Sequence, residues 1–194
     1  MIAYLLVFAA AAGSTGNDAV SVRIMHDYGR CVVARDQRRA RELLSMDYRT
    51  DAYSKALLRL ADRNKGCIPP AGQLRFHPVL FAGALAEALL ERDARGSNLA
   101  QLLAVDPAKA AIPIRSDLDA MALCTIARTP ANSAQLLATK PMSKDESIAI
   151  RALAPVLTDC LRKDLKVTFN RPALRSVMAL TAWRIVAKPR GAAE

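Results

Sequence analysis

The chain has 194 residues, of which 52% are apolar but only 5% are aromatic. The core is therefore expected to consist of aliphatic side chains in closely packed helices, and so much aliphatic content excludes a disordered chain. The net charge of +10 favours anionic partners such as nucleic acid, anionic lipid or acidic protein, although a solvated basic surface gives the same value.

The N-terminal residues have the pattern of a secretory signal. Met1 to Ala12 are almost wholly apolar, and small residues follow from Gly13. The run is too short to span a bilayer, which takes about 20 residues, but it fits the apolar region and cleavage site of a signal peptide. No basic side chain precedes Arg23, which is atypical, and the alternative is a buried N-terminal helix. We expect residues 1–13 to be a signal peptide, the protein to be periplasmic or secreted, and no transmembrane span to remain after cleavage.

The rest of the chain matches itself when it is shifted by 93 residues. Cys31 then falls on Cys124 and Cys67 on Cys160, with 10 identities over the 37 aligned positions. Such a repeat predicts a tandem duplication, and two copies form a pseudo-symmetric unit rather than a solenoid. We expect an all-α, pseudo-symmetric helical bundle with about four helices per copy. Repeat 1 covers residues 14–95, a connector 96–113 and repeat 2 residues 114–190, together forming one compact domain.

Capping residues and apolar periodicity place the helices of repeat 1. A first helix is expected over residues 19–35, and Asp36 can cap a second. Thr50 is positioned to cap a third helix, and His77 stands at the cap position before a proline that opens a fourth helix over residues 79–90.

Equivalent signals recur in repeat 2. The connector contains one short expected helix over residues 99–105, and Ser116 is a credible start for the next helix. Thr129 is equivalent to Asp36 and precedes a proline at the first helical position. Ser143 and Glu146 form a capping box, in which Glu146 is expected to reach back to the cap residue. The last helix starts near Asn170.

The four cysteines are expected to form two disulfides. If the first three helices of a copy run up, down and up, both of its cysteines lie at the same end of the bundle, which predicts Cys31–Cys67 and Cys124–Cys160. Each bond is worth about 4 kcal/mol in the chain-entropy model. Buried free thiols are the main alternative. A zinc or catalytic role is disfavoured, because cysteine ligands of zinc normally lie two to four residues apart and no such pair occurs.

No catalytic motif stands out. The chain lacks a Gly-rich phosphate loop, a Gly-x-Ser-x-Gly elbow and a His-Glu-x-x-His helix. His26 and Asp27 are helical neighbours that do not face each other, and His77 is expected to cap its helix. The carboxylates Glu42, Glu87 and Glu91 could in principle form a glycosidase pair, but surface positions are their default. We predict no catalytic residue, no bound metal and no cofactor, and lean towards a non-enzymatic protein.

Arginines are the candidate anion-binding residues. They are Arg35, Arg38, Arg39 and Arg128, and Arg35 and Arg128 hold equivalent positions in the two copies. The alternatives are a solvated helix face or arginines that bond helix-terminal carbonyls. We do not expect nucleic acid to be a partner, because aromatic side chains do not interleave with these arginines and the N-terminal signal points outside the cytosol.

The pattern Tyr28-Gly-Arg-Cys-Val-Val-Ala-Arg35, followed by a Leu-Leu helix, a Leu-x-x-Leu-Ala helix and the second cysteine, resembles uncharacterised secreted proteins of proteobacteria. The resemblance covers most of the chain beyond residue 13 and implies export to the periplasm, but no activity and no site residues. Repeat 2 departs from the pattern, with Met121-Ala-Leu123 in place of Tyr-Gly-Arg.

Together these features predict a binding or scaffold role towards a protein or an anionic envelope surface, with the groove between the two copies as the natural site. The alternative is a cell-envelope hydrolase with carboxylates converging in that groove, and a weaker one is a cytosolic nucleic-acid binder. Two buried carboxylates facing one cleft would favour the hydrolase, whereas an exposed apolar patch beside arginines would favour binding.

Overall fold

The computed structural model describes residues 16–68, 77–110, 112–165 and 167–188. Every regular element in these ranges is a helix, which confirms the all-α class. The expected signal peptide, residues 1–13, lies outside the described residues. Within the described part of the chain, none of the helices combines the length and the hydrophobicity that a membrane span requires.

The N-terminal half consists of α1 (Gly16–Ser45), α2 (Asp51–Arg63), a short 3-10 turn η1 (Lys65–Cys67) and α3 (Pro78–Asp93). The sequence predicts two helices where α1 stands, and α1 does contain a non-helical residue, Asp36, with φ −141° and ψ 46°. The expected capping role of the Asp36 side chain is not what the structure shows, because its carboxylate accepts hydrogen bonds from the Arg39 guanidinium.

A connector carrying α4 (Leu99–Leu103) leads to the C-terminal half. That half consists of α5 (Asp117–Arg128), α6 (Pro130–Ala138), α7 (Lys144–Cys160) and α8 (Arg171–Ala187). Thr129 occupies the cap position of α6 as expected, but its side chain makes no capping bond. Its hydroxyl instead donates to the Thr125 carbonyl, one turn back.

Elements of the two halves begin at matching positions. Helix α2 starts at residue 51 and α7 at 144, while α3 starts at 78 and α8 at 171, so both pairs are 93 residues apart. Thr129 has φ −138° and ψ 60°, close to the values of Asp36, which lies 93 residues earlier. The shift that aligns the sequence therefore also aligns the helix starts and the break after the first helix.

Side-chain caps fix the starts of five of the described helices, including α4, where Asn98 accepts the N–H of Ala100. Thr50, Ser116, Ser143 and Asn170 each accept a backbone N–H of the first turn, as their residue types predict. The capping box at Ser143 differs in one detail, because Glu146 accepts the N–H of Met142 rather than that of Ser143. His77 stands at the cap position of α3, but its side chain makes no capping bond.

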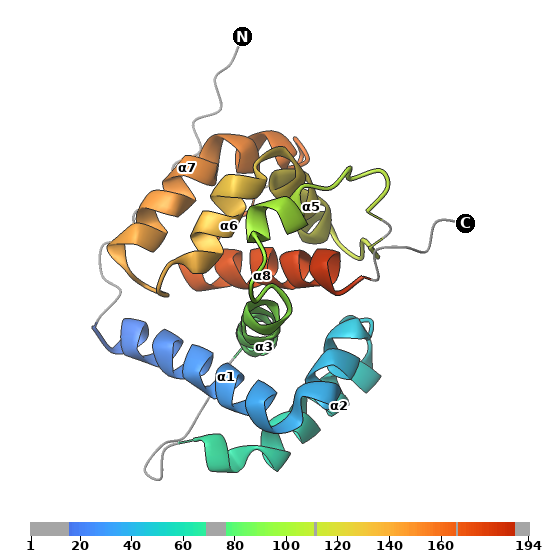
Figure 1. Cartoon of the computed structure of the whole chain (residues 1–194), viewed down its shortest axis with the longest axis vertical. Coiled ribbons are helices and arrows are strands. Elements are labelled where there is room, and N and C mark those ends of the chain that lie inside the picture. Colours follow the sequence, from blue (N-terminus) through green and yellow to red (C-terminus); the bar gives the residue numbers. More distant parts are fainter. Residues whose placement is uncertain (1–15, 69–76, 111, 166, 189–194) are drawn as a thin grey trace.

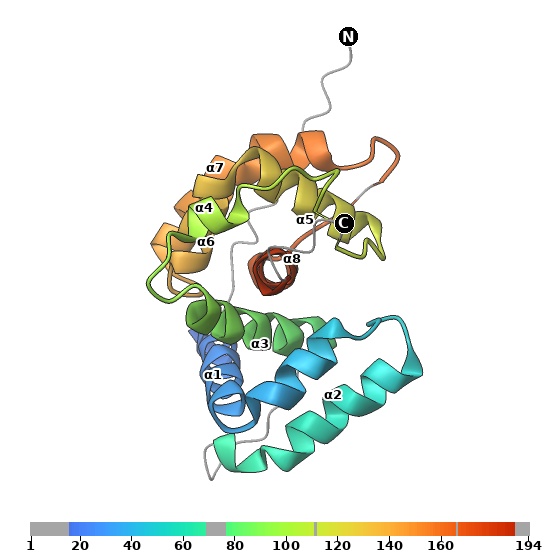
Figure 2. The same cartoon turned by 45° about the vertical axis from the view of Figure 1, so that its right-hand side comes forward.

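Helices α3 and α8 form the centre of the molecule and cross each other there (Figures 1 and 2). Helices α1 and α2 lie on one side of this pair, and α4 to α7 lie on the other. The crossing is close at Gly83, where an added Cβ would lie 2.4 Å from the Cβ of Ser176. Gly83 and Ser176 are themselves 93 residues apart, so the two helices meet at corresponding positions.

The structure contains both disulfides of the expected pairing. Cys31 is bonded to Cys67 and Cys124 to Cys160, and the Cα atoms are 5.8 Å apart in each pair. Cys31 lies within α1 and Cys124 within α5, and each is bonded to a cysteine 36 residues later in the chain. The second bond ends on the last residue of α7 itself, whereas the first ends on η1, just beyond α2.

Candidate functional site

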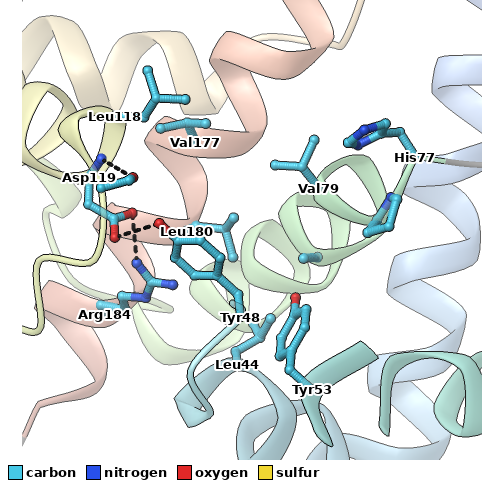
Figure 3. A pocket seen from close by; sticks show the side chains of 13 residues that line it. Leu44, Tyr48, Tyr53, His77, Val79, Leu118, Asp119, Val177, Leu180 and Arg184 are labelled. Carbon is cyan, nitrogen blue, oxygen red and sulfur yellow. Dashed lines mark hydrogen bonds and ion pairs between the residues drawn. The ribbon is translucent and has the colours of Figure 1, made fainter. Parts of the chain in front are cut away.

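A pocket of about 320 Å³ lies between the two halves, where the sequence analysis placed the natural binding site. This volume is at the lower end of the range for small-molecule sites. Most of its walls are aliphatic or aromatic (Figure 3). The N-terminal half contributes Leu44, Tyr48, Tyr53, His77, Pro78, Val79 and Ala82, and the C-terminal half contributes Ser116, Leu118, Asp119, Val177, Leu180 and Arg184.

The two tyrosines of the pocket are held by the turn between α1 and α2. Tyr48 lies in this turn, and Tyr53 lies in the first turn of α2, where its N–H donates to the capping hydroxyl of Thr50 over 3.2 Å. Tyr53 is only 6% exposed. Figure 3 shows its hydroxyl pointing into the pocket. Among the residues that the structure describes, this hydroxyl has no hydrogen-bond partner.

A buried ion pair closes the other side of the pocket. The Arg184 guanidinium donates to Asp119 Oδ1 over 3.1 Å, and the Tyr48 hydroxyl donates to Asp119 Oδ2 over the same distance. The Arg184 guanidinium carbon also lies 5.6 Å from the centre of the Tyr48 ring, within the range of a cation–π contact. The side chains of Arg184 and Asp119 are 8% and 10% exposed, and the Nε of Arg184 has no partner among the described residues.

These groups suit binding better than catalysis. Burial raises the pKa of Tyr53 to about 12, so its hydroxyl stays protonated and acts as a hydrogen-bond donor at neutral pH. Burial also raises the pKa of Tyr48. The Asp119 carboxylate is neutralised by Arg184 and is therefore poorly placed to act as a general base.

A second buried polar cluster lies on the opposite side of the α3–α8 crossing and is centred on Arg175, which is 1% exposed. Its Nε and Nη2 donate to the two oxygens of Glu87 over 2.7 and 2.9 Å, a bidentate pair between α8 and α3. Its Nη1 donates to Glu146 over 3.2 Å. His26 completes the cluster, with Nδ1 3.4 Å from Glu87 Oε2.

The Arg175 guanidinium also serves as the cap of α6. It donates to the carbonyls of Leu136, Leu137 and Thr139 at the end of that helix, and the Leu136 carbonyl also accepts from the N–H and hydroxyl of Thr139. Burial alone would raise the pKa of Glu87, but the hydrogen bond from His26 and the charge of Arg175 outweigh it, and the pKa lies below its ordinary value. The cluster therefore ties α1, α3, α6, α7 and α8 together and holds Glu87 ionised.

The structure does not arrange the three carboxylates that the sequence offered for hydrolysis as an acid–base pair. Glu87 and Glu91 both line a second hollow of about 520 Å³ beside α4 and α6, but Glu91 is 58% exposed and lies 3.7 Å from Arg30. Glu42 accepts from Arg38 on the surface. A general acid needs a raised pKa, and that of Glu87 is lowered. Within the described residues, no cluster of three or more His, Cys, Asp or Glu is arranged to hold a metal.

The four candidate anion-binding arginines are largely occupied. Arg38 and Arg39 pair with Glu42 and Asp36, and Arg128 pairs with Asp159 over 3.1 Å. The guanidinium groups of Arg35 and Arg128 lie 3.8 and 3.9 Å from the Sγ atoms of Cys67 and Cys160, respectively. The equivalent positions of these two arginines are thus explained by an equivalent contact with the two disulfides.

Sequence reasoning missed the roles of His26, Glu87 and Arg175. Glu87 was assigned to the surface by default, although it lies in an otherwise apolar run of α3 that is buried on all sides. A charged residue in such a run is expected to be paired, and this signal was available. The sequence did not indicate which residue pairs with Glu87, because Arg175 lies 88 residues away in the chain.

Comparison of the chain with protein-family models, with curated proteins and with solved structures found no match. Its class is therefore defined by what the structure shows: an all-α protein with two disulfides and an apolar pocket between two sets of helices.

Proposed function

We propose that this protein is an exported, non-enzymatic binding protein, and that the pocket between its two halves takes up an apolar group of its ligand. The observation that carries the proposal is the pocket itself: apolar walls, contributions from both halves, and a few polar groups on its surface. This combination is typical of ligand sites.

Export is supported by the two disulfides and by the pattern of residues 1–13. Disulfides form and persist mainly in oxidising compartments such as the periplasm or the extracellular space. The resemblance to secreted proteobacterial proteins points the same way. To test this, the full chain is expressed in a bacterium and the periplasmic fraction is analysed by mass spectrometry. We expect cleavage near residue 13 and no free thiols, and an uncleaved, reduced chain in the cytosol would refute export.

Binding is favoured over hydrolysis by the state of the carboxylates. Glu87 and Glu146 are held by Arg175, and Asp119 is held by Arg184. An acid–base pair needs one carboxyl group that keeps its proton and one that is free to accept a proton. The buried carboxylates of this protein are instead neutralised by guanidinium groups.

The pocket is tested with a neutral naphthylamine dye, whose fluorescence rises in an apolar site. Val79→Phe places a ring in the pocket without changing charge. Ile148→Phe is the matched control, because Ile148 is 54% exposed and does not line the pocket. We expect Val79→Phe to weaken dye binding about tenfold or more, equivalent to about 1.4 kcal/mol, and the control to leave it unchanged. Equal binding by wild type and both variants would refute the pocket as the site.

A further inference from the structure

The pocket and the Arg175 cluster occupy corresponding places in the two halves. With the shift of 93 residues, Arg175 corresponds to Ala82 (175 − 93 = 82) and Glu146 to Tyr53 (146 − 93 = 53). Ala82 and Tyr53 both line the pocket. The helices that carry these residues begin at corresponding positions, and α3 and α8 touch at the corresponding pair Gly83 and Ser176.

The correspondence extends to the other members of the cluster. Glu87 corresponds to Leu180 (87 + 93 = 180), His26 to Asp119 (26 + 93 = 119) and Leu137 to Leu44 (137 − 93 = 44). Leu180, Asp119 and Leu44 all line the pocket as well. The position of the buried guanidinium and four positions around it thus correspond to five residues that line the pocket.

The pocket is therefore the place where one half lacks the side chain that the other half has. In the C-terminal half the Arg175 side chain lies between α8 and the end of α6 and makes bonds to Glu87 and Glu146. In the N-terminal half the corresponding residue is Ala82, which ends at Cβ. The volume that Arg175 fills on its own side has no counterpart side chain on the other.

The replacements around the pocket also change its charge preference. Both carboxylates that hold the guanidinium of Arg175 are replaced, one by Tyr53 and the other by Leu180. Asp119 is neutralised by Arg184. A cation in the pocket would lose its water without gaining a free carboxylate, and an anion would meet the already paired Asp119, so either charge is penalised.

The Tyr53 hydroxyl points into the pocket (Figure 3) and has no hydrogen-bond partner among the described residues. The Nε–H of Arg184 also lacks a partner, but this atom is fully buried and out of reach of a ligand. His77 lines the pocket as well, but its side chain is exposed. A ligand that supplies an acceptor oxygen gives the Tyr53 hydroxyl a hydrogen-bond partner.

We infer that the pocket binds a small, uncharged molecule with an aromatic or aliphatic body and an acceptor oxygen, in the place that corresponds to the side chain of Arg175. This inference rests on the proposed binding function and adds the chemical class of the ligand.

The test uses four probes on one naphthalene frame: 2-naphthamide, which is neutral and has a carbonyl oxygen; 2-naphthamidine, which is cationic; 2-naphthoate, which is anionic; and 2-methylnaphthalene, which lacks an acceptor. Binding of each to the disulfide-bonded protein is measured by titration in NMR spectra. We expect the amide to bind about tenfold or more tightly than either charged probe. Tyr53→Phe should weaken amide binding about fivefold, the effect of one hydrogen bond, and leave methylnaphthalene binding unchanged.

A gain of function provides the sharpest result. Leu180→Glu restores the carboxylate that Glu87 supplies on the other side, and Leu180→Gln is its neutral control. We expect Leu180→Glu to bind the amidine about tenfold more tightly than wild type does, and Leu180→Gln to show no such gain.

The failures are distinguishable. If none of the four probes binds the folded wild-type protein, the proposed apolar site is refuted. If the amidine or the naphthoate binds wild type as tightly as the amide, or if Leu180→Glu gains no affinity for the amidine, the pocket still binds apolar groups but the inferred ligand class and the correspondence with Arg175 are wrong.

Discussion

Replacing Arg175 by methionine tests whether the buried cluster holds the two halves together. The change keeps the length of the side chain but removes the guanidinium. Glu87 and Glu146 then remain buried, at 7% and 1% exposure, and keep only the more distant neighbours His26, at 3.4 Å, and Arg171, at 3.8 Å. The carbonyls of Leu137 and Thr139 at the end of α6 also lose the guanidinium donor, whereas that of Leu136 keeps two donors from Thr139.

The expected loss follows from these contacts. Leaving a buried charge without its partner costs about 3–5 kcal/mol, and the freed carbonyls add to this. For a chain of this size about 1 kcal/mol lowers the melting temperature by about 2–4 °C, so we expect a fall of about 6–20 °C. The control is Arg38→Met, which removes an exposed pair with Glu42 and should cost less than about 1 kcal/mol.

Urea denaturation followed by the fluorescence of Trp183, the only tryptophan of the chain, measures this loss. Without the charge of Arg175, burial raises the pKa of Glu87 in the folded state. A carboxyl group whose pKa is higher in the folded state than in the unfolded state destabilises the fold at any pH above its unfolded pKa. The loss of stability caused by Arg175→Met should therefore be smaller at about pH 5 than at about pH 8. The triple variant with Glu87→Gln and Glu146→Gln should recover part of the stability. A loss below about 1 kcal/mol for Arg175→Met would refute the reasoning.

Three further predictions concern the pocket, the crossing and the disulfides. The pKa of Tyr53 is raised, so the burial of its ring contributes stability that is complete below about pH 10 and lost as the pH rises to about 12. A titration followed by tyrosinate absorbance should therefore show a step near pH 12 in the wild type that is absent in Tyr53→Phe. Gly83→Ala should cost about 1–3 kcal/mol in urea denaturation, because the new Cβ would lie 2.4 Å from that of Ser176. Replacing Cys31 and Cys67 by serine should lower the stability by about 4 kcal/mol, since the bond closes a long loop.

Each of these three has its own control or contrary result. A titration curve that Tyr53→Phe leaves unaltered would mean that the ring is not buried as described. Gly66→Ala is the control for the crossing, because the nearest atom to its new Cβ is the flexible end of Arg35, at 3.0 Å; equal losses for the two glycine variants would contradict a special role for the crossing. A disulfide-free variant as stable as wild type would show that packing alone holds α1 and η1 together.

Local signals predicted the fold well because they act within a few residues. The caps Thr50 and Ser143 and the prolines after His77 and Thr129 placed helix starts correctly. Residue type was less informative about side-chain partners. Asp36 and Thr129 occupy the expected positions, yet one pairs with an arginine and the other bonds to its own preceding helix.

The position of the candidate site could be predicted from the sequence, but its shape and the pairing of the buried residues could not. The two copies suggested a groove between them, and the pocket lies there. The shape of the pocket depends on the small side chain of Ala82. This side chain affects the pocket only because α3 packs across α8. The partners Glu87 and Arg175 come together through the same crossing, which no local pattern encodes.

The crossing of α3 and α8 has a consequence for synthesis. The core around α1, α2 and α3 includes Ala179 and Trp183 of α8, the last helix that the structure describes. A growing chain therefore exposes one face of α3 until α8 has been made. Cys31 and Cys67 can form their disulfide before that, because both precede α3 in the chain. Such an early bond would hold α1 and η1 together before Ala179 and Trp183 complete the core. The first disulfide can thus close before α3 has been made, whereas the second, which ends on Cys160, can close only after most of the chain is complete.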